Sequence, residues 1–270
     1  MRAEGVEIAR PLADRVVVVT RAAAQAKALR DALEADGARV VLMPTIVIEP
    51  PVDWGPLDLA LDCAGDYRWV IFTSVNGVDM TRRRLAERGR GAEVLHGRRV
   101  AAIGPATASA LEAWGLRAEL VPDEYVAEGL VRRLAQVVAP GDRVLLPRAA
   151  ETRDLLVREL LSLGAHVDEV AAYRTRPADG TGAELRALLA GRAVDVVTFT
   201  SSSTVRHFAA LFAPDEMPRL MRGVRVACIG PVTRATAEGL GLATTIMPAE
   251  YTIPALAAAI ARHYVSEKRS

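Results

Sequence analysis

The sequence predicts an α/β protein with two similar doubly wound parallel-sheet domains, and three observations lead to that prediction. The chain has 270 residues, which at about 150 residues per domain is enough for two compact units. Motifs from its first half return in the same order in its second half. Short apolar runs alternate with longer helical patterns, as in a parallel sheet that helices cover on both faces.

The expected strands are short runs that are apolar throughout, which is typical of strands buried on both faces of a parallel sheet. Apolar residues at helical spacing follow at 22–34 and 155–163, and Gly37 and Gly164 supply the usual helix stop. In the first half of the chain the strands are predicted at Val16–Val19, Val40–Met43, Trp69–Phe72 and Val100–Ile103.

The internal repeat has an offset of about 126 residues. Residues 99–107 (RVAAIGPAT) return as residues 225–233 (RVACIGPVT), and 70–78 return as 197–205. So many matches in one order exceed chance, so we predict two related units of roughly 125 residues each. The other matching pairs are 17–21 with 144–148, 37–40 with 164–167, and 122–125 with 248–251.

Composition excludes several classes of protein. The 34 basic and 33 acidic residues nearly cancel, whereas a nucleic-acid binder usually has a basic excess. No apolar run reaches the roughly 20 residues of a membrane span, and the N-terminus lacks a secretory signal pattern. Cys63 and Cys228 are far apart, and the four histidines lack ligand spacing. We expect a cytoplasmic protein with no metal site and no nucleic-acid or membrane partner.

Motifs for nucleotide and nucleophile chemistry are missing from the sequence. No G-x-G-x-x-G opens a helix, and no G-x-x-x-x-G-K-[ST] phosphate loop occurs. There is no serine elbow and no cysteine–histidine nucleophile pair. Any catalysis is therefore expected to need no cofactor.

Ligands of doubly wound sheets bind beyond the carboxyl ends of the strands, so the loops at these ends are candidate binding segments. Arg21 and Arg148 each follow the first strand of a repeat, and Arg153 lies shortly after the second. A guanidinium beside a helix N-terminus suits a carboxylate or phosphate. The alternative is that these arginines are solvated surface residues.

Two further loop types repeat. The segments 73–77 and 200–204 are rich in hydroxyls, which either cap helices or bind carboxylates. The Gly-Pro-x-Thr segments either allow close approach of a ligand or form only a tight turn. The candidate binding residues from all these loops are Thr20, Arg21, Ser74, Asn76, Gly77, Gly104, Thr107, Arg148, Arg153, Ser201, Ser202, Ser203, Gly230 and Thr233.

In order and spacing, a set of short motifs resembles the uroporphyrinogen-III synthase family along almost the whole chain. One departure is the Ser201-Ser-Ser-Thr204 segment, where the family usually has a Ser-Pro-Ser-Gly type of turn. The motifs that carry the resemblance are VTR at 19–21, FTSVNG at 72–77, IGPAT at 103–107, LPR at 146–148 with Arg153, AYRT at 172–175, FTS at 199–201 and IGPVT at 229–233.

The resemblance implies that the two domains are interleaved. The chain would leave the first domain near Val47, complete the second, and return near Arg174, with the two crossings forming a two-stranded linker. The first domain would then comprise residues 1–47 and 175–270, and the second residues 48–174. A substrate cleft would lie between them.

The resemblance also implies a reaction: the linear tetrapyrrole hydroxymethylbilane is cyclised to uroporphyrinogen III, with loss of water and inversion of ring D. This substrate carries eight carboxylates. Because it can close unassisted without inversion, such an enzyme must mainly control geometry. Tyr173 is the expected catalytic residue, because its protonated phenol could donate a hydrogen bond to the departing hydroxyl. The alternative is a tyrosine that only packs at the domain junction.

Two other functions stay open at this point. One is a non-catalytic two-lobed protein that binds or senses an anionic small molecule, and the other is a nucleotide-dependent enzyme. The synthase interpretation is preferred, as a monomeric lyase of porphyrin biosynthesis. A transient contact with the upstream hydroxymethylbilane synthase would be its only protein partner.

Overall fold

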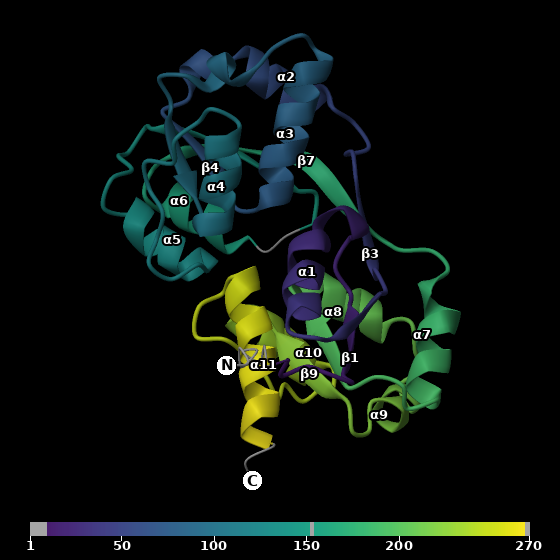
Figure 1. Ribbon diagram of the computed structural model, residues 1–270. Coiled ribbons are helices and arrows are strands. Elements are labelled where there is room, and N and C mark those ends of the chain that lie inside the picture. The colour runs from purple at the N-terminus through teal and green to yellow at the C-terminus, as the bar shows by residue number, and fades with distance from the viewer. Residues whose placement is uncertain (1–9, 152–153, 268–270) are drawn as a thin grey trace, which may run out of the picture. The chain divides into compact units, whose positions relative to one another are not determined.

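The computed structural model describes residues 10–151 and 154–267, and the chain divides into two compact units (Figure 1). Unit 1 comprises residues 1–47 and 177–270, and unit 2 comprises residues 48–176. Unit 1 is therefore built from two separate stretches of chain. The return from unit 2 to unit 1 comes after Arg176, two residues later than the sequence-based division.

The sheet of unit 1 has the strand order β2-β1-β8-β9, and every neighbouring pair is parallel. Parallel strands need crossover connections, which the helices between them provide. The strands are β1 Val16–Val19, β2 Arg39–Leu42, β8 Val196–Phe199 and β9 Arg225–Cys228. The helices are η1 Ala23–Gln25, α1 Lys27–Ala35, α7 Thr181–Ala190, α8 Ser202–Ala209, α9 Glu216–Leu220, α10 Pro231–Gly239 and α11 Ile253–Glu267.

Helices cover both faces of this sheet. Val17 and Val19 of β1 pack with α1 and α11 in one apolar cluster. Val18, which points to the opposite face, packs with α7, α8 and α10 in another. The apolar runs are continuous because both faces of each strand are buried.

The sheet of unit 2 has the strand order β3-β7-β6-β4-β5. Its β7-β6-β4-β5 part repeats the β2-β1-β8-β9 order of unit 1, strand for matching strand, which confirms the predicted duplicated fold. The strands are β3 Ile46–Glu49, β4 Trp69–Phe72, β5 Arg99–Ala102, β6 Arg143–Ala149 and β7 His166–Pro177. The neighbouring strands β3 and β7 each cross the division between the units, so the first two residues of β3 and the last residue of β7 belong to unit 1. The helices are α2 Gly55–Asp62, η2 Ala64–Asp66, α3 Val75–Glu87, η3 Ala92–Leu95, α4 Pro105–Ala113, α5 Ala127–Leu134 and α6 Leu155–Ser162.

Unit 2 is also covered on both faces. Val70 and Phe72 of β4 pack with α2, α3 and α4, and the alternate residues Trp69 and Ile71 pack with α5 and α6. The doubly wound α/β class is thus confirmed in both units. Several of these helices end where a glycine takes the left-handed conformation, as at Gly164 after α6, whose φ is +81°.

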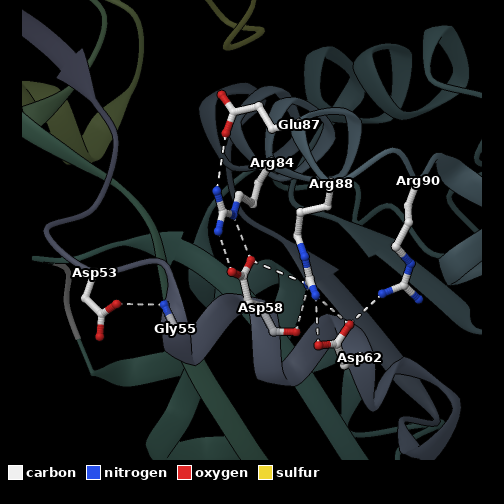
Figure 2. Close-up of polar contacts among 8 residues, drawn as sticks. All are labelled: Asp53, Gly55, Asp58, Asp62, Arg84, Glu87, Arg88 and Arg90. Atoms are coloured by element: carbon white, nitrogen blue, oxygen red, sulfur yellow. Dashed lines mark hydrogen bonds and ion pairs between the residues drawn. The ribbon is translucent and has the colours of Figure 1, made fainter.

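Charged side chains join α2 to α3 on the surface of unit 2 (Figure 2). Arg84 of α3 binds both carboxylate oxygens of Asp58 on α2, with Nε–Oδ1 2.8 Å and Nη2–Oδ2 2.5 Å. Arg88 and Arg90 both bind Asp62, at 2.9 and 2.6 Å. The bidentate geometry of Arg84 makes its bond with Asp58 the strongest of these contacts, and it holds the pKa of the Asp58 carboxyl below its usual value. We name Asp58, Asp62, Arg84, Arg88 and Arg90 the α2–α3 ion network.

No helix in residues 10–151 and 154–267 is long and apolar enough to cross a bilayer. No group of three or more His, Cys, Asp or Glu side chains in the same residues is placed to hold a metal ion.

Candidate active site

The predicted site residues lie at the carboxyl ends of the strands in each unit. In unit 2 they follow β4 and β5 and occupy the ends of β6 and β7. In unit 1 they follow β1, β8 and β9, the matching strands. Each unit thus gathers its own set at one edge of its sheet, as the parallel topology requires. Arg153 lies outside the described residues.

Tyr173 and Ser74 meet in unit 2. Their hydroxyl oxygens are 3.1 Å apart, and the Tyr173 side chain is only 8% exposed. Ser74 is the N-cap of α3, and its Oγ accepts a hydrogen bond of 3.0 Å from the Gly77 backbone N–H. The cap fixes the serine hydroxyl, and that hydroxyl in turn holds the phenol in place.

A shift in strand register accompanies the placement of Tyr173. Along most of the β6–β7 pair the residues match one to one, with Arg148 opposite Ala171. The next pair is Ala149 with Tyr173, so β7 contains one extra residue at this point. Irregularities of this kind redirect side chains near active sites. As a result, Ala172 and Tyr173 are both buried although they are consecutive.

Arg148 is a buried cation with a fixed carboxylate partner. Its side chain is 3% exposed, and its Nε lies 2.9 Å from Oε1 of Glu169 on the neighbouring strand. Burial lowers the pKa of the Arg148 guanidinium, and the charges of Glu169 and Asp154 partly oppose that shift. Glu169 was not among the residues predicted from the sequence, because only the pairing of β7 with β6 brings it beside Arg148.

Gly77 brings the first turn of α3 close to β6. A Cβ atom at this position would lie 3.0 Å from the Pro147 carbonyl oxygen and 3.4 Å from Ser74 Oγ. Only glycine allows this approach without a shift of the backbone. Its role is therefore to position the helix that carries Ser74. Asn76 is half-buried in the same turn.

Arg21 follows β1 in unit 1 and differs from Arg148 in its surroundings. It is half-buried, and its Nε is fully buried without a hydrogen-bond acceptor. No carboxylate pairs with it among the residues that the structure describes, and burial alone lowers the pKa of its guanidinium. A buried cation of this kind is costly unless an anion binds it. Arg21 is therefore suited to a ligand carboxylate.

Thr20 precedes Arg21 but uses its hydroxyl within the sheet. This hydroxyl is fully buried and donates a 2.6 Å hydrogen bond to the Thr198 carbonyl. The Thr20 carbonyl oxygen accepts a 3.0 Å bond from the Thr45 backbone N–H. These contacts hold the end of β1 in place, so Thr20 positions Arg21.

The three serines after β8 have separate roles. Ser201 caps α8 in a reciprocal capping box with Thr204. Ser202 joins α8 to α10, with 2.7 Å between its hydroxyl and that of Thr236. Only the hydroxyl of Ser203 has no partner within the described ranges. The Ser201–Thr204 segment thus forms a regular helix start.

Gly104 and Gly230 occupy the N-cap positions of α4 and α10, with φ values of −173° and −170°. This backbone is extended, so conformation alone does not require glycine there. Thr107 and Thr233 lie in the first turns, as predicted, and are only 3% and 5% exposed. Neither hydroxyl has a hydrogen-bond partner in the part of the chain that the structure describes.

Comparisons with known proteins agree with one another. The family model described as "Uroporphyrinogen-III synthase HemD" matches residues 27–258. The chain is 36% identical over 255 residues to a uroporphyrinogen-III synthase of Synechococcus elongatus, covering 93% of this chain and 96% of the relative. It is 28% identical over 249 residues to a uroporphyrinogen-III synthase of Chlorobaculum parvum, covering 92% and 98%.

Solved structures show the same fold at low sequence identity. A uroporphyrinogen III synthase mutant from Thermus thermophilus superposes with a TM-score of 0.67 at 18% identity, covering 94% of this chain and 99% of that one. A uroporphyrinogen-III synthetase from Helicobacter pylori gives a TM-score of 0.58 at 16% identity, covering 95% and 100%.

Proposed function

The chain belongs to the uroporphyrinogen-III synthase family, and from that premise we propose that it cyclises hydroxymethylbilane to uroporphyrinogen III. The proposed enzyme is a lyase, because water is lost and a ring closes in one overall reaction. The substrate is a small tetrapyrrole with eight carboxylates. Its flexible chain must be held so that ring D closes in the inverted orientation.

The proposed chemistry is balanced without an oxidant or a reductant. The hydroxyl leaves the terminal hydroxymethyl carbon with a proton donated to it, and the pyrrole nitrogen supplies electrons to form an azafulvene. The substituted carbon of ring D attacks this electrophile and gives a spiro intermediate. The intermediate fragments and closes again in the inverted orientation, and loss of a ring proton restores the pyrrole. The net products are uroporphyrinogen III and one water molecule.

Tyr173 is the proposed donor to the leaving hydroxyl, and the 3.1 Å contact of its phenol with Ser74 is the observation that carries this proposal. In this role the Ser74 O–H donates to the phenol oxygen, while Ser74 Oγ accepts from Gly77. The phenol O–H is then left to donate to the substrate. A phenol O–H is a suitable hydrogen-bond donor to a departing hydroxyl.

Carboxylate binding is proposed to be divided among several loops. Arg21 is the proposed cationic contact, because it lacks a carboxylate of its own among the described residues. Thr107, Thr233 and Ser203 are the proposed hydroxyl contacts, with Asn76 and Arg153 as further members of the set. The supporting residues, which position these groups, are Thr20, Ser74, Gly77, Gly104, Arg148, Ser201, Ser202 and Gly230.

The test is to supply hydroxymethylbilane to the purified chain and to identify the uroporphyrinogen isomer by chromatography after oxidation. The type III isomer is the expected product. Unassisted closure gives the type I isomer and serves as the no-enzyme control. If the chain yields only type I at the unassisted rate, the synthase proposal is wrong. Tight binding of the substrate without type III product would then favour the non-catalytic binding protein.

A further inference from the structure

The repeated segment Pro122–Tyr125, matched by Pro248–Tyr251, has no role in the function proposed so far. Both copies follow an isolated parallel bridge, Ala101 with Leu120 and Ala227 with Ile246. Both then form the same turn, in which the backbone N–H after the tyrosine bonds back to the glutamate carbonyl, at 2.8 and 2.9 Å. The two units therefore keep one tyrosine each at matching places.

Each tyrosine lies against the glycine that begins a helix. A Cβ atom on Gly104 would lie 3.1 Å from Cβ and 3.2 Å from Cγ of Tyr125. A Cβ atom on Gly230 would lie 3.1 Å from Cγ and 3.3 Å from Cδ1 of Tyr251. Because the glycine backbone is extended, it is the tyrosine, and not a turn, that would have to move by a few tenths of an ångström to admit a Cβ atom. The Gly-Pro-x-Thr and Pro-x-Glu-Tyr motifs thus form one packing unit.

The polar groups beside this packing unit are unused. Tyr125 and Tyr251 are half-buried, and neither phenol has a hydrogen-bond partner within residues 10–151 and 154–267. The neighbouring Thr107 and Thr233 are more than nine-tenths buried and equally unpartnered there. The hydroxyl oxygens of these two threonines keep some solvent contact, so a ligand could reach them. Helices α4 and α10 are each nine residues long, and the partial positive charge at the N-terminus of each helix favours an anion.

We propose that Tyr125 and Tyr251 are substrate-positioning residues, one in each unit, whose phenols donate hydrogen bonds to substrate carboxylates at the N-termini of α4 and α10. This inference rests on the proposed function, because it takes the octacarboxylate tetrapyrrole as the ligand. Each phenol acts with the threonine of the same helix start, Thr107 or Thr233. Neither tyrosine takes part in bond making or breaking.

The substitutions Tyr125→Phe and Tyr251→Phe test the proposal, because phenylalanine keeps the ring against the glycine and removes only the hydroxyl. We expect KM for hydroxymethylbilane to rise about tenfold in each variant, with kcat within about twofold of the parent. The melting temperature should not change. In the double variant the two increases should multiply, because the sites are in separate units.

A binding measurement separates this inference from the proposed reaction. The probe is uroporphyrin, the stable fluorescent octacarboxylate obtained by oxidation of the product, titrated into the full-length protein. The Kd should rise about tenfold in each Tyr→Phe variant. The control Tyr264→Phe removes a buried phenol beside Arg15, which directly precedes β1 at its amino end and not at the carboxyl end, and should leave Kd unchanged.

Each outcome decides the question. If the parent makes type III product and both Tyr→Phe variants keep the parental KM and Kd, the tyrosines only pack against the glycines and the inference is wrong. If the parent makes only type I product but uroporphyrin binding weakens in both variants, the reaction proposal fails and the binding role stands. If the parent neither makes type III product nor binds uroporphyrin, both proposals are overturned.

Discussion

The two units share one strand order, yet their candidate sites differ in charge and in reactive groups. Arg21 of unit 1 and Arg148 of unit 2 follow matching strands at the offset of the internal repeat. Arg148 has Glu169 at 2.9 Å, whereas at the position that corresponds to Glu169 unit 1 has Leu42. Arg148 of unit 2 therefore has a counter-charge within the fold, whereas Arg21 of unit 1 has none among the described residues.

The two units also differ in the side chain at the position of the proposed reactive group. Tyr173 of unit 2 corresponds to Ile46 of unit 1, although the capping serines Ser74 and Ser201 are found in both. Only unit 2 can form the phenol–serine pair. The difference shows how a duplicated fold can keep one scaffold and divide its tasks. Under the proposed function, unit 1 supplies the free cation and unit 2 supplies the proton donor.

The largest expected effect comes from removing the phenol hydroxyl of Tyr173, whose counterpart in unit 1 is an isoleucine. Tyr173→Phe should lower kcat by about 10²-fold or more, because general acid catalysis typically contributes that factor. Thermal unfolding should change little, since the ring is retained. Steady-state production of the type III isomer is the measurement, and Tyr264→Phe is the matched control. A near-parental kcat in Tyr173→Phe would show that Tyr173 is not the proton donor and that the units do not differ in this way.

The next effect concerns the free cation of unit 1. Arg21→Gln should raise KM and the Kd for uroporphyrin by roughly 10- to 100-fold, the range for losing a charged hydrogen bond. Because the guanidinium has no carboxylate partner in the described chain, its removal should not lower the melting temperature. Arg39→Gln, an exposed arginine at the start of β2, is the control for a plain loss of charge. Unchanged affinity in Arg21→Gln would mean that the unpaired cation has no ligand role.

A third effect tests whether the cation of unit 2 is structural. Glu169→Gln removes the negative charge that lies 2.9 Å from the buried Arg148 guanidinium, which should lower the free energy of unfolding by about 1–3 kcal/mol. Chemical denaturation measures this loss. KM should change much less than in Arg21→Gln. A large rise in KM with unchanged stability would instead mean that Arg148, like Arg21, binds the substrate.

The smallest expected effect is a difference between the units in how their contributions to the free energy of unfolding depend on pH. Asp58 and Arg84 pair in unit 2, whereas Leu185 and Leu211 stand at the matching positions in an apolar cluster of unit 1. Asp58→Asn should lower the free energy of unfolding by about 1 kcal/mol at neutral pH. Because pairing lowers the pKa of Asp58, this contribution is present above about pH 4 and is lost as the pH falls through the lowered pKa.

Urea denaturation of the parent and of Asp58→Asn at pH 7 and at about pH 2 gives the comparison. The stability difference should be smaller at the lower pH, because protonation of the parental carboxyl removes its charge. A difference that persists unchanged at low pH would show that the side chain contributes by packing and not by charge. Leu185→Asn in unit 1 should instead be destabilising at both pH values, because it buries a polar group in an apolar cluster.

The sequence by itself determined the strands, the duplicated order and most of the loops that carry the site. Continuous apolar runs such as 16–19 and 69–72 report burial on both faces, and a repeated motif such as Gly-Pro-x-Thr reports a repeated turn. Such patterns are local or recur along the chain, so they can be interpreted without knowledge of the tertiary contacts. The helix starts at Thr107 and Thr233 are examples.

Only the tertiary structure decided which of these residues are already occupied. Thr20, Ser201 and Ser202 look like ligand groups in the sequence, but their hydroxyls bond to Thr198, Thr204 and Thr236. Glu169 neutralises Arg148 from the neighbouring strand, while Arg21 has no such neighbour among the described residues. The physical reason is that hydrogen bonding and charge pairing act across strands and helices far apart in the chain. The sequence shows which hydrogen-bond donors and acceptors are present, and the fold decides which of them interact.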